Sequence, residues 1–115
     1  MVTARTVRYY ESIALIPPGE RVGSGQSYYP EETVTRLKKI EQLKQLGLSL
    51  DEVREVIDLY FTDLSGRGPK RKVLAILRQH LAEVDGKLAA FGKFRNELLA
   101  NIDRFERWFE QSDER

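Results

Sequence analysis

Apolar residues recur along this chain at the three- and four-residue spacing of amphipathic helices, interrupted by one glycine-rich stretch. A first helix is predicted over residues 3–13, because Thr3 can cap its start while Pro17 and Pro18 exclude its continuation. A second helix is predicted from Pro30 to Gly47. Its apolar face consists of Val34, Leu37, Ile40, Leu43 and Leu46.

Two further signals organise the first half of the chain. Residues 20–29 contain two short strand-like pieces around a Gly-Ser-Gly tip, whose glycines permit the positive φ angles of a tight hairpin, and we interpret this hairpin as a wing. Ser49 and Glu52 form a capping box, in which a hydroxyl and a carboxylate satisfy the free amides at a helix start. The helix that follows has an apolar stripe of Leu50, Val53, Val56, Ile57 and Tyr60.

A long helix is predicted in the second half. Beyond a loop at residues 62–69, about forty residues follow without a proline. At about 1.5 Å per residue this helix would span roughly 60 Å, more than a small domain can cover, so its apolar seam predicts a homodimer. Arg95 interrupts the seam. The dimerisation residues are Leu74, Leu77, Leu81, Val84, Leu88, Phe91, Leu98, Ile102 and Phe105, and Phe109 continues the pattern.

Composition limits what this chain can do. Its 115 residues suffice for one compact domain, or for a small domain and one long helix. Charged residues make up 32% but the net charge is +1, so nucleic-acid binding must come from local clusters. The absence of cysteine and the single histidine, His80, exclude disulfides and zinc clusters, and we expect no metal and no cofactor. Without a signal peptide or a membrane-length apolar run, we expect a cytoplasmic protein with no membrane partner.

The first helix carries side chains suited to reading DNA. Arg8 can direct two donors to a guanine edge or a phosphate, and Tyr9 offers a flat ring with a polar tip. Tyr10 lies at core spacing from Val7 and is expected to be buried. Short polar groups at the helix start, groups of the hairpin and an arginine of the second helix are candidates for phosphate contacts. The predicted DNA-binding residues are Thr3, Arg5, Thr6, Arg8, Tyr9, Arg21, Ser24, Tyr29 and Arg36.

Residues 6–16, Thr-Val-Arg-Tyr-Tyr-Glu-Ser-Ile-Ala-Leu-Ile, resemble the recognition helix of the MerR family of bacterial transcription regulators, with Ala14 where that family has glycine. The hairpin and the Leu-Gly-Leu-Ser-Leu-Asp-Glu-Val corner at residues 46–53 follow the family's order. The resemblance implies a mainly α fold. A winged helix-turn-helix DNA-binding domain would occupy residues 1–61, and a dimerisation helix that pairs as an antiparallel coiled coil would occupy residues 69–111.

The same resemblance implies a function. Members of the family bind a near-palindromic operator in double-stranded DNA as homodimers and modulate transcription by distorting the promoter spacer. RNA polymerase at the promoter is therefore an expected partner, and the nucleoid is the expected location. The resemblance leaves room for a small-molecule effector of unidentified chemistry. No nucleophile and base, phosphate loop or carboxylate cluster stands at workable spacing, so we expect no enzyme activity.

Two departures from the family pattern keep a second hypothesis open. The family has a further helix before the one that starts here at Thr3, and its loss is expected to expose Val7 and Ile13. In the wing, Gln26 and Ser27 stand where the family has an aromatic residue and an arginine, so one phosphate contact is expected to be lost. The alternative is a coiled-coil interaction protein that pairs with a full-length relative and blocks its DNA binding.

Overall fold

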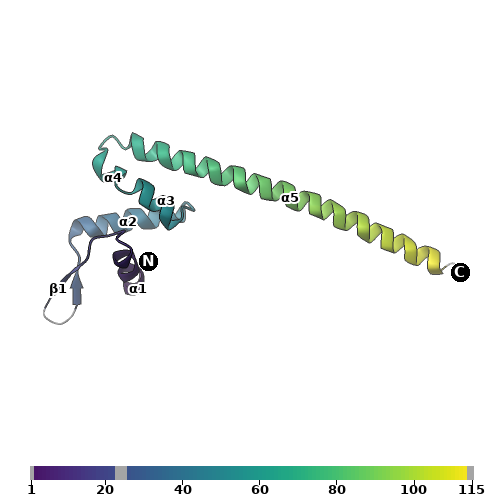
Figure 1. The fold of residues 1–115 in the computed structure, drawn as a ribbon, viewed down its shortest axis with the longest axis horizontal. Coiled ribbons are helices and arrows are strands. Elements are labelled where there is room, and N and C mark those ends of the chain that lie inside the picture. The colour runs from purple at the N-terminus through teal and green to yellow at the C-terminus, as the bar shows by residue number, and fades with distance from the viewer. Residues whose placement is uncertain (1, 23–25, 114–115) are drawn as a thin grey trace. The chain divides into compact units, whose positions relative to one another are not determined.

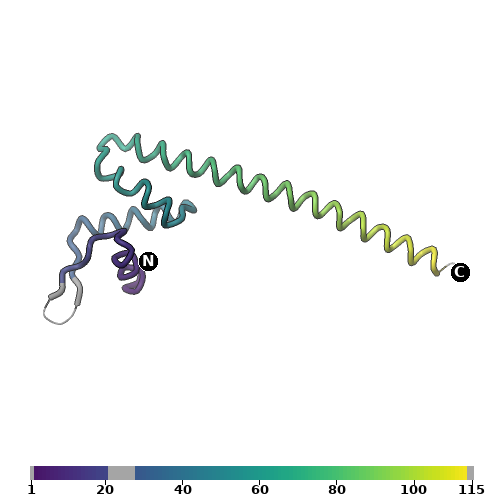
Figure 2. The backbone as a smooth tube through the Cα atoms, viewed as in Figure 1, coloured from purple at the N-terminus to yellow at the C-terminus, as the bar shows by residue number. Residues whose placement is uncertain are grey.

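The computed structural model describes residues 2–22 and 26–113 and is mainly helical (Figure 1). The chain divides into two compact units, Met1–Leu77 and Arg78–Arg115, and the last helix contributes to both. Figure 2 traces the backbone through the same elements. In chain order these are α1 (Ala4–Ser12), β1 (Glu20–Val22), β2 (Gln26–Tyr28), α2 (Glu31–Gln45), α3 (Leu50–Val56), α4 (Leu59–Thr62) and α5 (Arg67–Asp113).

One hydrophobic core holds the first unit together. Tyr10 of α1 is buried in it, as predicted, and each large side chain buried this way contributes about 1.5–3 kcal/mol. Val7 and Ile13 were expected to be exposed but are half-buried, because they lie on the same face of α1 as Tyr10 and pack against the core. The buried core residues are Tyr10, Leu15, Ile16, Ile40, Leu43, Leu48, Val53, Val56, Ile57, Val73 and Ile76.

Helix α1 ends in a Schellman motif centred on Ala14. The Ala14 N–H donates to the Glu11 carbonyl at 3.1 Å. The next N–H, of Leu15, donates to the Tyr10 carbonyl at 2.9 Å, so carbonyls that the helix end leaves free are satisfied. The motif holds Ala14 at φ 58°, in the left-handed region where a Cβ costs about 1 kcal/mol. The turn places Leu15 in the core beside Tyr10, and this burial offsets the strain.

Helix α2 ends in the same motif, with Gly47 in the left-handed position at φ 100°. Leu48 donates its N–H to the Leu43 carbonyl at 3.3 Å and is 4% exposed. This turn corrects the predicted apolar face of the helix. Leu46 is 54% exposed, because the chain turns there and Leu48 enters the core in its place, and Val34 in the first turn is also exposed.

The predicted capping box and hairpin are both present. The Glu52 N–H donates to Ser49 Oγ at 3.2 Å, and the Ser49 N–H donates to Glu52 Oε1 at 2.9 Å. Strands β1 and β2 pair antiparallel, with Glu20 opposite Tyr28. The helix after the capping box is shorter than predicted, because a turn at residues 57–58 separates α3 from α4.

Helix α5 follows a loop that is fixed by Asp63. The Asp63 carboxylate accepts from the Ser65 hydroxyl at 2.6 Å and from the N–H groups of Gly68 at 2.8 Å and Ser65 at 3.0 Å. These bonds favour the ionised carboxylate, and they lower the pKa of Asp63. The loop therefore presents a negative charge at the positive end of α5, which favours helix initiation there.

Most of the apolar seam of α5 is exposed in the single chain, but Leu77, which was predicted to lie in the dimer interface, is half-buried because it packs against the core. Leu81 is 60% exposed, Leu88 63% and Phe91 69%, so the seam buries little of its surface within one copy. None of the helices in the described part of the chain combines the length and the apolar content needed to cross a membrane. An exposed apolar row of this length is typical of a surface that packs against another helix.

Replacing Ala14 by glycine is expected to stabilise the fold by about 0.5–1 kcal/mol, because glycine adopts a positive φ without a Cβ clash and Ala14 is exposed. Gly47→Ala is the matched control, since it introduces the same Cβ into the same motif and should destabilise by about 1 kcal/mol. Urea unfolding followed by circular dichroism measures both. Equal midpoints for the wild type and Ala14→Gly would show that Ala14 is not strained.

Candidate nucleic-acid interface

One face of α1 is exposed along its length. Its residues follow the helical repeat, three and four positions apart: Arg5, Arg8, Tyr9 and Ser12. Tyr9 is 52% exposed. Within the part of the chain that the structure describes, neither Arg5 nor Arg8 forms a hydrogen bond or an ion pair. Both guanidinium groups keep their donors for a ligand, and a planar fork of donors matches guanine edges and phosphates.

Two other residues predicted to contact DNA take part in the start of this helix. Thr3 Oγ1 accepts from the Thr6 N–H at 3.1 Å and lies 2.9 Å from Thr6 Oγ1. This bond satisfies one of the amides that a helix start leaves free. The threonines therefore fix where α1 begins. Because Arg5 is the second residue of α1, its position is fixed as well.

Tyr10 fastens the opposite face of α1 to α2. Its hydroxyl donates to Glu41 Oε1 at 2.8 Å and accepts from Lys44 Nζ at 3.0 Å. Burial raises the pKa of Tyr10, and the hydrogen bond to Tyr10 raises the pKa of Lys44. Both groups are therefore held in their protonated forms at neutral pH.

Glu11 connects α1 to both ends of the wing. Its carboxylate accepts from the Gly19 N–H at 3.3 Å and from the Tyr29 hydroxyl at 2.7 Å. Gly19 lies so close to the Tyr29 ring that a Cβ on it would stand 2.7 Å from a ring carbon. Tyr29, which we predicted to contact phosphate, thus has its hydroxyl on Glu11. The hairpin leaves and rejoins the domain through contacts with one side chain of α1.

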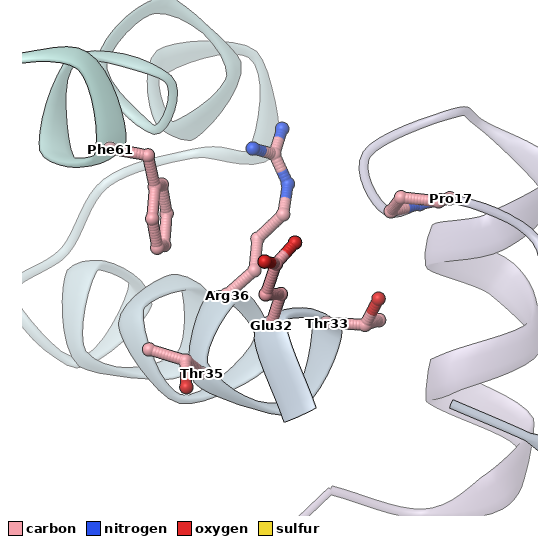
Figure 3. A pocket seen from close by; sticks show the side chains of 6 residues that line it. All are labelled: Pro17, Glu32, Thr33, Thr35, Arg36 and Phe61. Atoms are coloured by element: carbon pink, nitrogen blue, oxygen red, sulfur yellow. The ribbon is translucent and has the colours of Figure 1, made fainter. Parts of the chain in front are cut away.

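Arg36 braces the turn that follows α1. Its Nε donates to the Leu15 carbonyl and its Nη1 to Asp58 Oδ1, both at 2.8 Å, and the side chain is 21% exposed. Figure 3 shows Arg36 reaching from α2 between Phe61 and Pro17, where these residues line an open groove of about 580 Å³. Arg36 was predicted to grip phosphate, and in the free protein two of its nitrogens are committed to this brace.

Sequence reasoning missed two residues that position the interface, Glu11 and Arg54. Arg54 of α3 donates from Nη2 to the Ile13 carbonyl at 2.7 Å, so a cation closes the carboxyl end of α1. No spacing rule pairs residues so far apart in the chain, and Glu11 was used only as part of a motif. Of the predicted wing contacts, Ser24 and the side chain of Arg21 lie outside the described residues. Tyr28 on β2 is 59% exposed.

Two protein-family models match this chain. The model described as MerR HTH family regulatory protein matches residues 1–59, and the model described as MerR, DNA binding, matches residues 34–100. The first match includes α1, the wing, α2 and α3, and the second runs from α2 into α5. Together they include the interface and most of the exposed seam.

Several curated proteins are similar over most of the chain. Nodulation protein NolA of a Bradyrhizobium species is 32% identical over 97 residues, which are 84% of this chain and 37% of NolA. The HTH-type transcriptional regulator HmrR of Sinorhizobium medicae is 34% identical over 89 residues, 77% of this chain and 58% of HmrR. Heavy metal-dependent transcription regulator 2 of Rhizobium meliloti is 31% identical over 97 residues, 84% of this chain and 64% of that protein. The chain thus spans between 37% and 64% of these relatives.

Stability is expected to fall above about pH 10, because Tyr10 and Lys44 both have raised pKa values in the folded protein. Below their unfolded values both groups are protonated in either state and the contribution is complete. As the pH rises, the unfolded chain loses these protons first, and the contribution is lost through the folded values. Tyr10→Phe removes the titrating hydroxyl, so its urea midpoint should fall less steeply between about pH 9 and 11. If the urea midpoints of the wild type and Tyr10→Phe fall equally with pH, the ionisation of Tyr10 does not cause the loss of stability.

Proposed function

This chain belongs to the MerR family of helix-turn-helix transcription regulators, and we propose that it binds a near-palindromic promoter operator in double-stranded DNA as a homodimer. Helix α1 is the proposed reading helix, and the β1–β2 hairpin is the wing. Distortion of the promoter spacer would then change how RNA polymerase, the expected partner, uses the promoter. The observation that carries this proposal is the exposed Arg5, Arg8 and Tyr9 face, whose arginines have no partner within the described residues.

Each predicted contact has a proposed role. Arg8 and Tyr9 stand in the middle of the exposed face, where a helix in the major groove approaches the base edges. Arg5, at the helix start, is placed for a phosphate or an adjacent base. Arg36 keeps Nη2 for a phosphate while Nε and Nη1 remain on their braces. The proposed backbone contacts, which orient the domain on the duplex, are completed by Thr3, Thr6, Arg21, Ser24 and Tyr29.

A regulator that bends DNA must itself resist bending. Deforming a site of this size costs roughly 1–6 kcal/mol, and the same force acts back on the protein. Tyr10 and Arg36 hold α1 and the turn after it on α2, Glu11 holds α1 on the wing, and Arg54 holds the end of α1 on α3. These ties support the proposal that deformation falls on the promoter spacer rather than on the reading helix.

The exposed seam of α5 supports the proposed homodimer. Two copies of the DNA-binding unit are needed to read a near-palindrome, since each half-site takes one reading helix. The seam residues recur at heptad spacing and, apart from Leu77, are about half exposed, from Leu98 at 45% to Phe91 at 69%. Pairing through this seam would bury them and link the two units.

Arg8→Ala is expected to weaken specific operator binding by about 1–3 kcal/mol, because a bidentate contact to a base or phosphate is lost. Fluorescence anisotropy on duplexes from the protein's own promoter region, with a scrambled duplex and a salt series, measures this. Arg104→Ala, an exposed arginine of α5, is the control and should bind as the wild type does.

The two readouts separate the possible roles of Arg8. A lost base contact reduces the preference over the scrambled duplex. A lost phosphate contact weakens binding to both duplexes and lowers the salt slope by about 0.9 per contact. Equal operator affinity for Arg8→Ala and Arg104→Ala would refute α1 as the reading helix. A wild-type dimer with no preference for operator DNA would favour the interaction-protein alternative.

Leu88→Asp is expected to give monomers, because pairing would bury an aspartate in the centre of the seam. Sedimentation velocity measures the oligomeric state directly. Ala100→Asp places the same side chain on the outward face of α5 and should leave the dimer intact. If Leu88→Asp sediments with the wild-type dimer, this seam is not the interface.

A further inference from the structure

The seam of α5 contains a single charged residue. When its apolar positions are assigned to a and d of a heptad repeat, Leu81 and Leu88 occupy a positions and Val84 and Phe91 occupy d positions. Arg95 then falls on the next a position. Its role depends on the pairing of two copies through α5 that is proposed above.

On its own helix Arg95 has no acidic residue three or four positions away, where side chains of a helix meet, and Asp85 has no basic residue at these positions. Neither residue forms a hydrogen bond or an ion pair with another group in residues 2–22 and 26–113. Asp103 and Arg107, by contrast, are one turn apart and form an ion pair at 2.9 Å. The residues three and four positions from Arg95 are Phe91, Gly92, Leu98 and Leu99, and those around Asp85 are Leu81, Ala82, Leu88 and Ala89.

The position of Arg95 discriminates between the two directions of pairing. In a parallel dimer in register, a positions face a positions, so the two Arg95 side chains would meet inside the seam with like charge. In an antiparallel dimer an a residue packs in the same layer as a d residue of the second copy. In this arrangement the e positions of the two copies face each other across the interface. Because an a position lies next to an e position on the helix surface, Arg95 at a can reach an e residue of the second copy.

We propose that, in the antiparallel pairing that the family resemblance implies, two copies of α5 take the register that sets Arg95 against Val84 of the second copy and beside its Asp85. Asp85 occupies the e position directly after Val84, on the side of the seam where Arg95 lies. Guanidinium and carboxylate are then within reach of a charge-assisted hydrogen bond. The twofold symmetry of the pair forms this contact twice.

The same register fits the apolar residues. Its twofold axis passes between Ala89 and Ala90, at the middle of Arg67–Asp113, so nearly the whole helix is overlapped by its partner. Large side chains pack against large side chains on either side of this axis. The matched layers are Leu88 with Phe91 and Leu81 with Leu98 of the second copy.

A slip of one heptad removes the ion pair. In one direction Arg95 meets Arg78 of the second copy at the flanking e position, and in the other direction it meets Gly92. Each slip displaces the copies by about 10 Å along the seam. This is close to a third of the roughly 34 Å between half-sites on DNA, so a dimer that reads both half-sites needs one defined register.

Charge reversal tests the pair. Arg95→Glu and Asp85→Arg are each expected to weaken the homodimer about ten-fold or more in sedimentation equilibrium, because each variant brings like charges together. In an equimolar mixture the two variants should form heterodimers well above the half expected for random pairing, since every charge then faces its opposite. Native mass spectrometry of the full-length chains counts the species. The Arg95→Glu/Asp85→Arg double variant should dimerise as the wild type does.

Matched controls carry the same charge changes on the outward face of α5. Lys93→Glu and Glu83→Arg should dimerise as the wild type does. If the wild type is a dimer but the two variants pair at random in the mixture, the proposed register is wrong. Preferential pairing of Arg95→Glu with the wild type would overturn it in favour of a parallel seam. A wild type that remains monomeric would instead overturn the homodimer of the proposed function.

A distance measurement tests the register without touching the ion pair. Because the chain has no cysteine, a spin label on Asn96→Cys reports a single distance within the dimer. The proposed register separates the two labels by about 20 Å along the helix axis, and a slip of one heptad changes this by about 10 Å. An axial separation that matches a slipped or parallel pair in electron double resonance would overturn the proposal.

Discussion

The burial of Tyr10 is the contact on which the DNA-binding unit depends. Helix α1 is 9 residues long, which is too short for a helix to be stable by itself in water. Tyr10 supplies the missing stability by placing its ring in the core and its hydroxyl between Glu41 and Lys44 of α2. The ring fixes which face of α1 is inside, and the two polar bonds fix its rotation. The outward direction of Arg8 and Tyr9 is a consequence of this single buried side chain.

The carboxyl end of α1 is held by polar contacts as well as by the burial of Leu15 and Ile16. Ile13 and Leu15 have carbonyls that α1 cannot satisfy by itself, and these accept from Arg54 and Arg36. The same residue type therefore serves two purposes in one small unit. Arg36 and Arg54 each donate to a free carbonyl, whereas Arg8 has no hydrogen-bond partner within the described residues and is the arginine proposed to contact DNA.

Much of the architecture could be predicted from the sequence because it depends on local rules. The cap at Thr3, the Ser49 and Glu52 capping box, the hairpin and the long helix α5, whose only proline is Pro69 in its first turn, are each set by residues close together in the chain. Leu46 was misplaced because the helical repeat was continued into the turn at residues 46–47, where α2 has already ended.

The long-range hydrogen bonds that hold the candidate interface could not be predicted from the sequence, for a physical reason. Arg36 was assigned to phosphate because an exposed arginine near a reading helix is a reasonable ligand. Its Nε and Nη1 bonds join residues 21 and 22 positions apart, which no periodicity reports. The family resemblance identified α1 as the proposed reading helix and marked Ala14 as unusual. Only the backbone angle shows that Ala14 occupies the left-handed position that a glycine would fill.

The lone charge in the seam of α5 also bears on which chains can mix. Cells that hold several related regulators risk mixed dimers, which would read two different half-sites at once. A partner helix with an apolar residue in place of Asp85 would leave the Arg95 guanidinium buried and unpaired, and such a group costs more than a lost leucine contact. In the proposed dimer, Arg95 would in this way favour pairing between copies of the same chain over pairing with a related chain.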